Sequence, residues 1–107
     1  MIAVNLTVDV HCIRPAWVHY LENIEYVNSI YRIYVNDDLL TERTWDNNFI
    51  VREEIWIHVI RHRLYTIRLE SVLVNPAQAT FILDNLLITH PHQQDIINQN
   101  TLSFTLA

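Results

Sequence analysis

Residues 31–45, YRIYVNDDLLTERTW, decide how this chain is expected to fold. In the first half of the stretch Tyr31, Ile33 and Val35 share one parity, and the residues between them fall on the other. The alternation stops at the polar residues 36–38, NDD, and a second run follows. A period of two on both sides of a polar break predicts a strand, a turn and a strand.

Strand-like segments recur before and after this hairpin. Residues 2–10 alternate almost without error, with apolar side chains at the even positions. The other expected strands, rich in β-branched or aromatic residues, are residues 33–36, 39–45, 49–51, 54–60, 64–70, 79–89 and 101–106. The polar residues 90–100 are interpreted as a loop that joins the last two strands. About eight short strands in close succession predict an all-β fold, an antiparallel β-sandwich that is jelly-roll-like.

One segment departs from the period of two. Between Arg14 and Ile30, after Pro15, apolar residues such as Trp17 and Leu21 recur at spacings of three and four. This spacing predicts one short helix or an ordered loop near residues 15–29.

Composition bounds the size of the fold and the class of partner. The chain has 107 residues, of which 50% are hydrophobic and 18% are charged, which is typical of a single folded domain over residues 1–107. Its formal charge is −5, and it contains no lysine. An acidic surface without lysine lacks the charge that neutralises phosphates, so neither nucleic acid nor a membrane is expected as a partner.

The amino end and the single cysteine bear on the compartment. The first ten residues contain neither a basic region nor a continuous apolar run, and no segment reaches the length of a membrane span. A soluble protein made in a cytoplasm is therefore expected. Cys12 cannot form an internal disulfide and is expected to be buried as a small hydrophobe.

Glycine is absent, although it makes up about 7% of average proteins. Turns that need a positive φ must therefore use asparagine or aspartate, which tolerate the left-handed region best after glycine. The expected turns are residues 36–38, 46–48, 75–76, 84–85 and 90–92. The absence of glycine also excludes a Gly-rich phosphate-binding loop and a dinucleotide-binding fingerprint.

The histidines suggest a metal site as one hypothesis. His58 and His62 have the spacing of two ligands on a helix, but Ile57 and its neighbours indicate a strand. His90 and His92 flank a proline in a turn, and no cysteine or carboxylate completes either pair. No metal and no cofactor is therefore expected.

The acidic residues are interpreted in the same way. Asp37, Asp38 and Glu42, with Asp46 close behind, could supply oxygen ligands to calcium, but turn residues that bond their own backbone are the favoured interpretation. Nothing distinguishes a pair of carboxylates suited to hydrolysis. No catalytic residue is assigned, and the chain is not expected to be an enzyme.

Asp84 interrupts an apolar pattern, because it shares its parity with Ile82, Leu86 and Ile88 in an expected strand. Either a β-bulge re-aims its side chain or the carboxylate bonds backbone groups of a neighbouring loop. A role in binding a ligand is the third alternative.

Aromatic residues between core positions give the best functional indication. Arg32 and Tyr34 alternate with the core residues of one expected strand, and Trp56 and His58 do so in another. If the two strands share a sheet, these four side chains form an exposed patch. Tyrosine, tryptophan and arginine are enriched at the centres of interfaces, and aromatic rings also stack on sugars. Either a partner contacts this patch or residues 14–30 cover it.

The run RIYVNDDLLTERTW, followed by EEIWIHV, LYTIRLE and FILDNLLI, resembles small β-sandwich virion proteins of tailed phages, particularly phages that infect cyanobacteria. It is also similar in layout to jelly-roll carbohydrate-binding modules. The similarity spans residues 31–89.

The two resemblances imply different functions. The phage resemblance implies a non-enzymatic structural protein, a capsid decoration or other particle protein, made in the host cytoplasm and located in the virion. Its partners would be other virion proteins and copies of itself in a homo-oligomer. The resemblance to carbohydrate-binding modules implies that aromatic side chains stack on glycans, often with calcium nearby.

Overall fold

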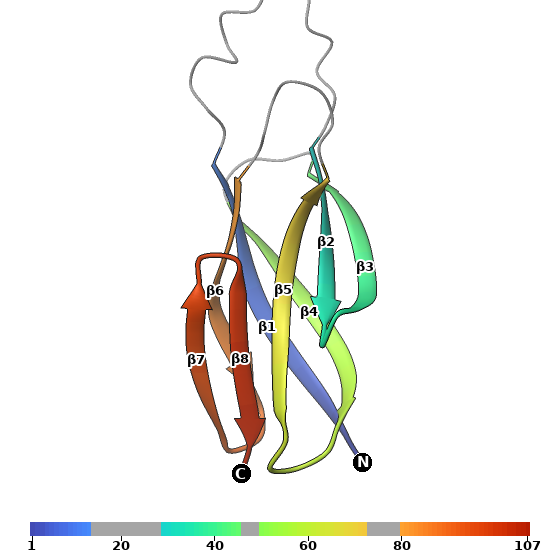
Figure 1. Ribbon diagram of the computed structural model, residues 1–107, viewed down its shortest axis with the longest axis vertical. Coiled ribbons are helices and arrows are strands. Elements are labelled where there is room, and N and C mark those ends of the chain that lie inside the picture. The colour runs from blue at the N-terminus through green and yellow to red at the C-terminus, as the bar shows by residue number, and fades with distance from the viewer. Residues whose placement is uncertain (14–28, 46–49, 73–79) are drawn as a thin grey trace, which may run out of the picture.

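The computed structural model describes residues 1–13, 29–45, 50–72 and 80–107, which form an all-β structure (Figure 1). Its strands are β1 (Ile2–Ile13), β2 (Ser29–Val35), β3 (Asp38–Trp45), β4 (Ile50–Val59), β5 (Leu64–Val72), β6 (Thr80–Ile88), β7 (His92–Asn98) and β8 (Thr101–Leu106). All of their pairings are antiparallel, and no described residue lies in a helix. The predicted antiparallel β-sandwich of about eight strands is confirmed.

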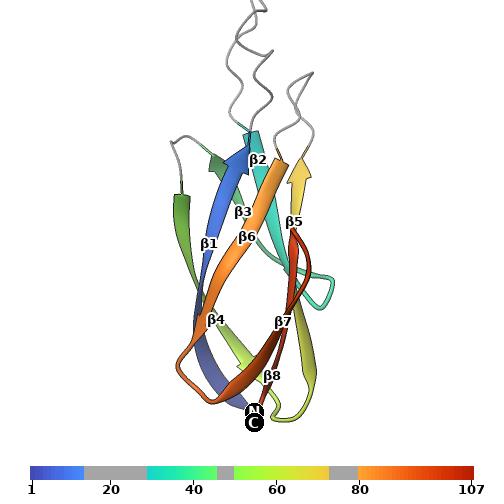
Figure 2. The same ribbon diagram turned by 90° about the vertical axis from the view of Figure 1, so that its left-hand side faces the viewer.

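The two sheets differ in size. The three-stranded sheet has the order β4-β1-β6, and the five-stranded sheet has the order β3-β2-β5-β8-β7. β2 and β3 lie in one sheet, as do β7 and β8, whereas every other pair of consecutive described strands is divided between the two sheets (Figure 2). This alternation between the sheets makes the sandwich jelly-roll-like, although its strands divide three and five and β1 lies between β4 and β6.

The core lies between the sheets and follows the alternation of the sequence. On β1 the apolar side chains at positions 4, 6, 8 and 10 are fully buried, and the residues between them face outward. The buried apolar side chains are Val4, Leu6, Val8, Val10, Tyr31, Ile33, Trp45, Ile55, Val59, Ile67, Leu69, Phe81, Leu83, Leu86, Leu102, Phe104 and Leu106. Cys12 is half-buried and packs against this cluster, instead of being fully buried as expected. Burial of each large aliphatic side chain stabilises the fold by roughly 1.5–3 kcal/mol, so this layer is its main source of stability.

A β-bulge explains the position of Asp84. The register between β6 and β1 shifts beside Asn85, which has φ of 53°. Because the bulge adds one residue, Leu83 and Leu86 both face the core while Asp84 faces outward, opposite Asp9. The first of the three alternatives for Asp84 is therefore the observed one.

Asparagine and aspartate adopt the left-handed backbone that glycine usually provides. Asn36 and Asp37, the central residues of the β2–β3 turn, have φ of 48° and 67°. Positive φ at both positions characterises the type I′ turn, whose twist matches that of a hairpin. His62 in the β4–β5 link also has positive φ, 66°, although it was not an expected site. The expected turns at residues 46–48 and 75–76 lie outside the described residues.

Replacing Asn36 by alanine should lower the free energy of unfolding by about 1–2 kcal/mol, since alanine fits the left-handed region less well. The change also removes the bond that Asn36 Oδ1 accepts from the Thr66 amide at 2.9 Å. Asn36→Gly is the matched control, because it loses the same bond and keeps the backbone conformation. Urea unfolding of both variants separates the contribution of the backbone conformation from that of the hydrogen bond. Equal losses of unfolding free energy in the two variants would contradict a contribution from the backbone conformation.

The strand boundaries differ from expectation in the middle of the chain. Residues 49–51 and 54–60 were expected to form separate strands, but β4 runs through both because residues 52 and 53 continue the register with β1. The helix or ordered loop expected near residues 15–29 lies outside the described residues, except that Ser29 begins β2.

The largest difference concerns residues 90–100, which were expected to be a loop. They contain β7, and residues 99–100 form its turn to β8. Asp and Asn have low strand propensity, and pairing with β8 outweighs that preference. The expected final strand at residues 101–106 is confirmed as β8.

Candidate interaction surfaces

The four candidate residues lie on opposite outer faces of the sandwich. Arg32 and Tyr34 belong to β2 in the five-stranded sheet, whereas Trp56 and His58 belong to β4 in the three-stranded sheet. Their strands do not share a sheet, so the condition for a single patch is not met. Each pair must be considered as a separate surface.

Arg32 and Tyr34 are part of a network of charges on the five-stranded sheet. Arg32 Nε donates to Glu42 Oε1 at 3.2 Å, across the β2–β3 pair. Side-chain hydrogen bonds with Tyr34 and then with Glu42 raise the pKa of Arg32 above its ordinary value. The Arg68 guanidinium lies 4.4 Å from the centroid of the Tyr34 ring, which is a cation–π contact.

Arg68 completes the network from β5. Its Nη1 donates to Glu70 Oε2 at 3.0 Å, and its Nη2 lies 3.7 Å from Asp37 Oδ1. The two arginines are therefore neutralised by carboxylates of the same face, and the Tyr34 ring is capped. Such a network stabilises the sheet locally and leaves little unsatisfied charge for a partner.

Trp56 dominates the other surface, since its side chain is 64% exposed. It lies opposite Asn5 on β1, and Asn5 Nδ2 donates to Glu54 Oε1 at 2.7 Å. Across β1, Leu87 faces outward from β6 opposite Thr7 and is 50% exposed. We call this surface the tryptophan face, formed by Ala3, Asn5, Thr7, Glu54, Trp56, His58 and Leu87.

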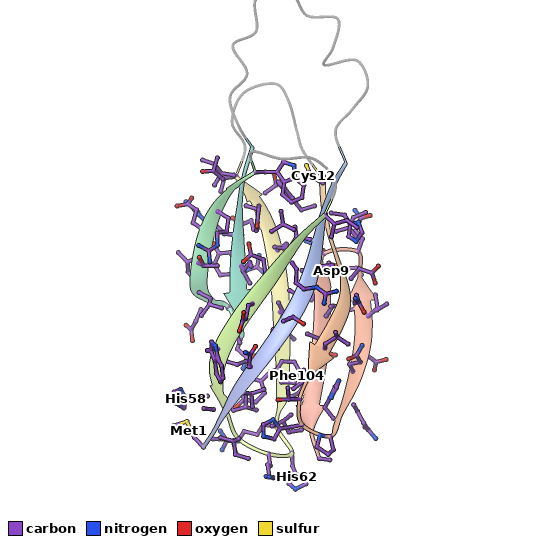
Figure 3. The ribbon with its side chains drawn as sticks, turned by 180° about the vertical axis from the view of Figure 1, so that it is seen from behind. Met1, Asp9, Cys12, His58, His62 and Phe104 are labelled. Carbon is purple, nitrogen blue, oxygen red and sulfur yellow. The ribbon has the colours of Figure 1, made fainter. Side chains whose placement is uncertain are left out.

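His58 lies at one margin of the tryptophan face, opposite Ala3 and at the same end of the molecule as Met1 (Figure 3). It is on a strand, as its neighbours indicated, and His62 lies in the turn beyond the end of β4. Across residues 1–13, 29–45, 50–72 and 80–107, no three His, Cys, Asp or Glu side chains gather closely enough to hold a metal ion.

A polar cluster around Asp9 crosses the same sheet farther along β1 (Figure 3). Arg52 Nε donates to Asp9 Oδ1 at 3.0 Å and its Nη2 to Oδ2 at 3.4 Å, while Asn85 Nδ2 donates to Oδ2 at 3.1 Å. The bonds from Arg52 and then from Asn85 lower the pKa of Asp9 below its ordinary 3.8. Because its donors come from β4 and β6, the cluster ties all three strands of this sheet together.

The Asp9 cluster should make stability depend on pH in acid. A carboxylate whose pKa is lowered by folding stabilises the protein above its unfolded pKa, and this stabilisation is lost as pH falls through the lower folded pKa. Asp9→Asn should therefore cost about 1 kcal/mol at pH 7 and almost nothing well below pH 3.8. Urea unfolding at both pH values, with Asp95→Asn on β7 as the control, measures this. If the free energy of unfolding of Asp9→Asn differed from that of wild type by the same amount at both pH values, the expected pH dependence would be contradicted.

Glu53 is a buried carboxylate that the sequence pattern did not single out. It is 5% exposed, accepts a hydrogen bond from the Tyr31 hydroxyl, and its Oε2 lies 3.5 Å from Arg43 Nε. The signal that could have found it is parity, because Glu53 shares the inward parity of Ile55 on β4. Since its partners come from the opposite sheet, its role is to join the two layers.

The comparisons with known proteins leave the function to be argued from these surfaces. No helix in the described part of the chain is long and apolar enough to cross a membrane. The chain matches no protein-family model, no curated protein and no solved structure.

Proposed function

We propose that this domain is a non-enzymatic structural protein of a phage particle, a capsid decoration or other virion component, which acts through protein–protein interfaces. Its partners in this proposal are other virion proteins and further copies of the same chain. It is made in the host cytoplasm and carried in the virion.

The exposure of Trp56 is the observation that carries the interface part of the proposal. Tryptophan is strongly buried on average and is enriched among the residues that dominate binding energy. Here the indole is 64% exposed on a regular strand, with exposed Leu87 across β1 on the same face. Asn5 and Glu54 lie beside the indole and are hydrogen-bonded to each other. Polar side chains of this kind suit the rim of a protein–protein interface.

The assignment to a virion is supported by the resemblance of residues 32–45 and the strands that follow them to small β-sandwich virion proteins. The chain lacks lysine and carries a net charge of −5, so it is poorly suited to bind the phosphates of nucleic acid. Together with a sandwich held by packing, this charge is consistent with a protein partner.

Mass spectrometry of particles purified on a density gradient tests the proposal directly. The chain should be present at a fixed number of copies per particle. Its absence from particles, in a lysate that contains the free protein, would overturn the virion assignment.

Trp56→Ala should reduce incorporation into particles by at least about tenfold, as expected for a residue at the centre of an interface. Leu64→Ala is a matched control, because Leu64 on the five-stranded sheet is 63% exposed. Circular dichroism should show that both variants remain folded. Equal incorporation of the two variants would move the interface away from the tryptophan face.

A glycan-binding module is the second candidate, favoured by the position of Trp56 beside hydrogen-bonding side chains. An exposed indole can stack on a sugar ring while Asn5 and Glu54 bond its hydroxyls. A glycan array with and without calcium separates the candidates. Saturable binding that Trp56→Ala abolishes would favour the module, and an array without signal would remove it.

A further inference from the structure

β7 (His92–Asn98) is an edge strand of the five-stranded sheet. Among the described residues it pairs with β8 alone, so its other side presents backbone N–H and C=O groups without a ladder partner. Such an edge is a template for a further strand, and natural proteins usually protect it with lysine, proline or inward charges. β7 contains neither lysine nor proline, and its one formal charge is Asp95.

β7 also exposes two adjacent isoleucines. Ile96 is 70% exposed and Ile97, the extra residue of a bulge, is 56% exposed. Ile96 lies opposite Leu102, which is buried in the core. It remains exposed because the three-stranded sheet does not extend over β7. Apolar surface and free backbone groups therefore coincide on one short strand.

The other sheet edges are less suited to accept a strand. β3 carries Asp38, Glu42 and Arg43, and β4 carries three charges in a row at residues 52–54, which disfavour the addition of a flat strand. β6 has one bulge, as β7 does, but the large apolar side chain that it exposes is Leu87 alone among its described residues, at 50%. β7 thus has fewer formal charges than β3 or β4, and it exposes more apolar surface than β6.

We propose that β7 pairs antiparallel with β7 of a second copy of this chain, which joins two five-stranded sheets edge to edge. The inference rests on the proposed function, in which the domain binds copies of itself, and it assigns that contact to β7 and not to the tryptophan face. An isologous contact of this kind closes as a two-fold dimer.

Charge and apolar contact favour a register centred on Ile96. A two-fold axis at Asp95 would place two carboxylates directly opposite each other, which is destabilising. An axis at Ile96 instead places Ile96 opposite Ile96 of the second copy. The two Asp95 carboxylates, one from each copy, are then no longer directly opposite each other. The two Ile96 side chains then cover each other across the axis, Asp95 lies opposite Ile97 of the second copy, and Gln94 lies opposite Asn98.

Cross-linking tests both the strand and the register. In a Cys12→Ser background, Ile96→Cys should form a disulfide-linked dimer on mild oxidation, because the two thiols face each other across the axis. Leu64→Cys is the control, since Leu64 is 63% exposed but lies on β5, an interior strand of the five-stranded sheet. Dimer formation by Leu64→Cys at the same rate as by Ile96→Cys would overturn the proposed register.

Sedimentation velocity of the otherwise unmodified chain tests the association itself. The wild type should show a monomer–dimer equilibrium, and Ile96→Lys or Ile97→Lys should raise its dissociation constant at least tenfold, whereas Leu64→Lys should not. A monomeric wild type at millimolar concentration, or a dimer indifferent to both lysines, would overturn the role of β7. Because these measurements use purified protein, absence of the chain from particles would overturn only the proposed function.

Discussion

Replacing Phe104 by alanine is expected to lower the free energy of unfolding by about 3–5 kcal/mol. Phe104 lies on β8 between the two sheets and is 1% exposed (Figure 3). Its ring stacks on Tyr65 with centroids 5.6 Å apart, so truncation removes both buried area and an aromatic contact. The loss would take a large share of the 5–15 kcal/mol typical of a domain, and urea unfolding measures it.

Two controls separate the cavity from general sensitivity of β8. Phe104→Leu keeps most of the volume and should cost roughly 1–1.5 kcal/mol. Thr105→Ala, at a half-buried position on the outer side of the same strand, should change stability by no more than about 0.5 kcal/mol. If Phe104→Ala lowered the free energy of unfolding no more than Thr105→Ala, the result would contradict the packing of Phe104 in the core.

The second large effect is expected from Tyr31→Phe, which should cost about 1–3 kcal/mol. The change removes the hydroxyl that donates to Glu53, and the carboxylate is 5% exposed. The ring remains, with its contacts to Trp45 and Phe81 at centroid distances of 6.1 and 5.0 Å. The loss therefore reports the hydrogen bond between the sheets and not the packing of the ring.

A double-mutant cycle with Glu53→Leu distinguishes a bonded pair from two independent sites. Once the carboxylate is gone, the Tyr31 hydroxyl has lost the acceptor across the sandwich, and Arg43, which is 52% exposed, can return to water. The double variant should therefore be more stable than the sum of the single losses predicts, by about 1 kcal/mol or more. Additive losses would show that the two groups do not interact.

Features that depend on neighbours in the chain could be predicted from the sequence. Alternation in residues 2–10 and 31–45 predicts strands because side chains on a strand point to opposite faces in turn. The absence of glycine predicts left-handed Asn and Asp, and Asn36, Asp37 and Asn85 adopt that conformation. The observed number of strands equals the expected number because two differences cancel. β4 joins two expected strands into one, and β7 adds a strand where a loop was expected.

Features that depend on which strands become neighbours required the tertiary structure. Parity places Arg32, Tyr34, Trp56 and His58 outward, but only the strand order shows that β2 and β4 lie in different sheets. The two pairs therefore occupy opposite faces, one neutralised by its own carboxylates and one exposing Trp56.

The same distinction explains β7 and Glu53. Residues 92–98 lack an apolar alternation because the three-stranded sheet does not cover them, and it is pairing with β8 that makes them a strand. Glu53 is tolerated inside the sandwich because Tyr31 and Arg43 reach it from the opposite sheet. By itself, the sequence determined the alternating strands, the inward faces of those strands and the Asn and Asp residues with positive φ, since these follow from local backbone geometry. The tertiary structure alone decided which outward residues lie together and which edge stays open, because strand pairing joins residues that are distant in the chain.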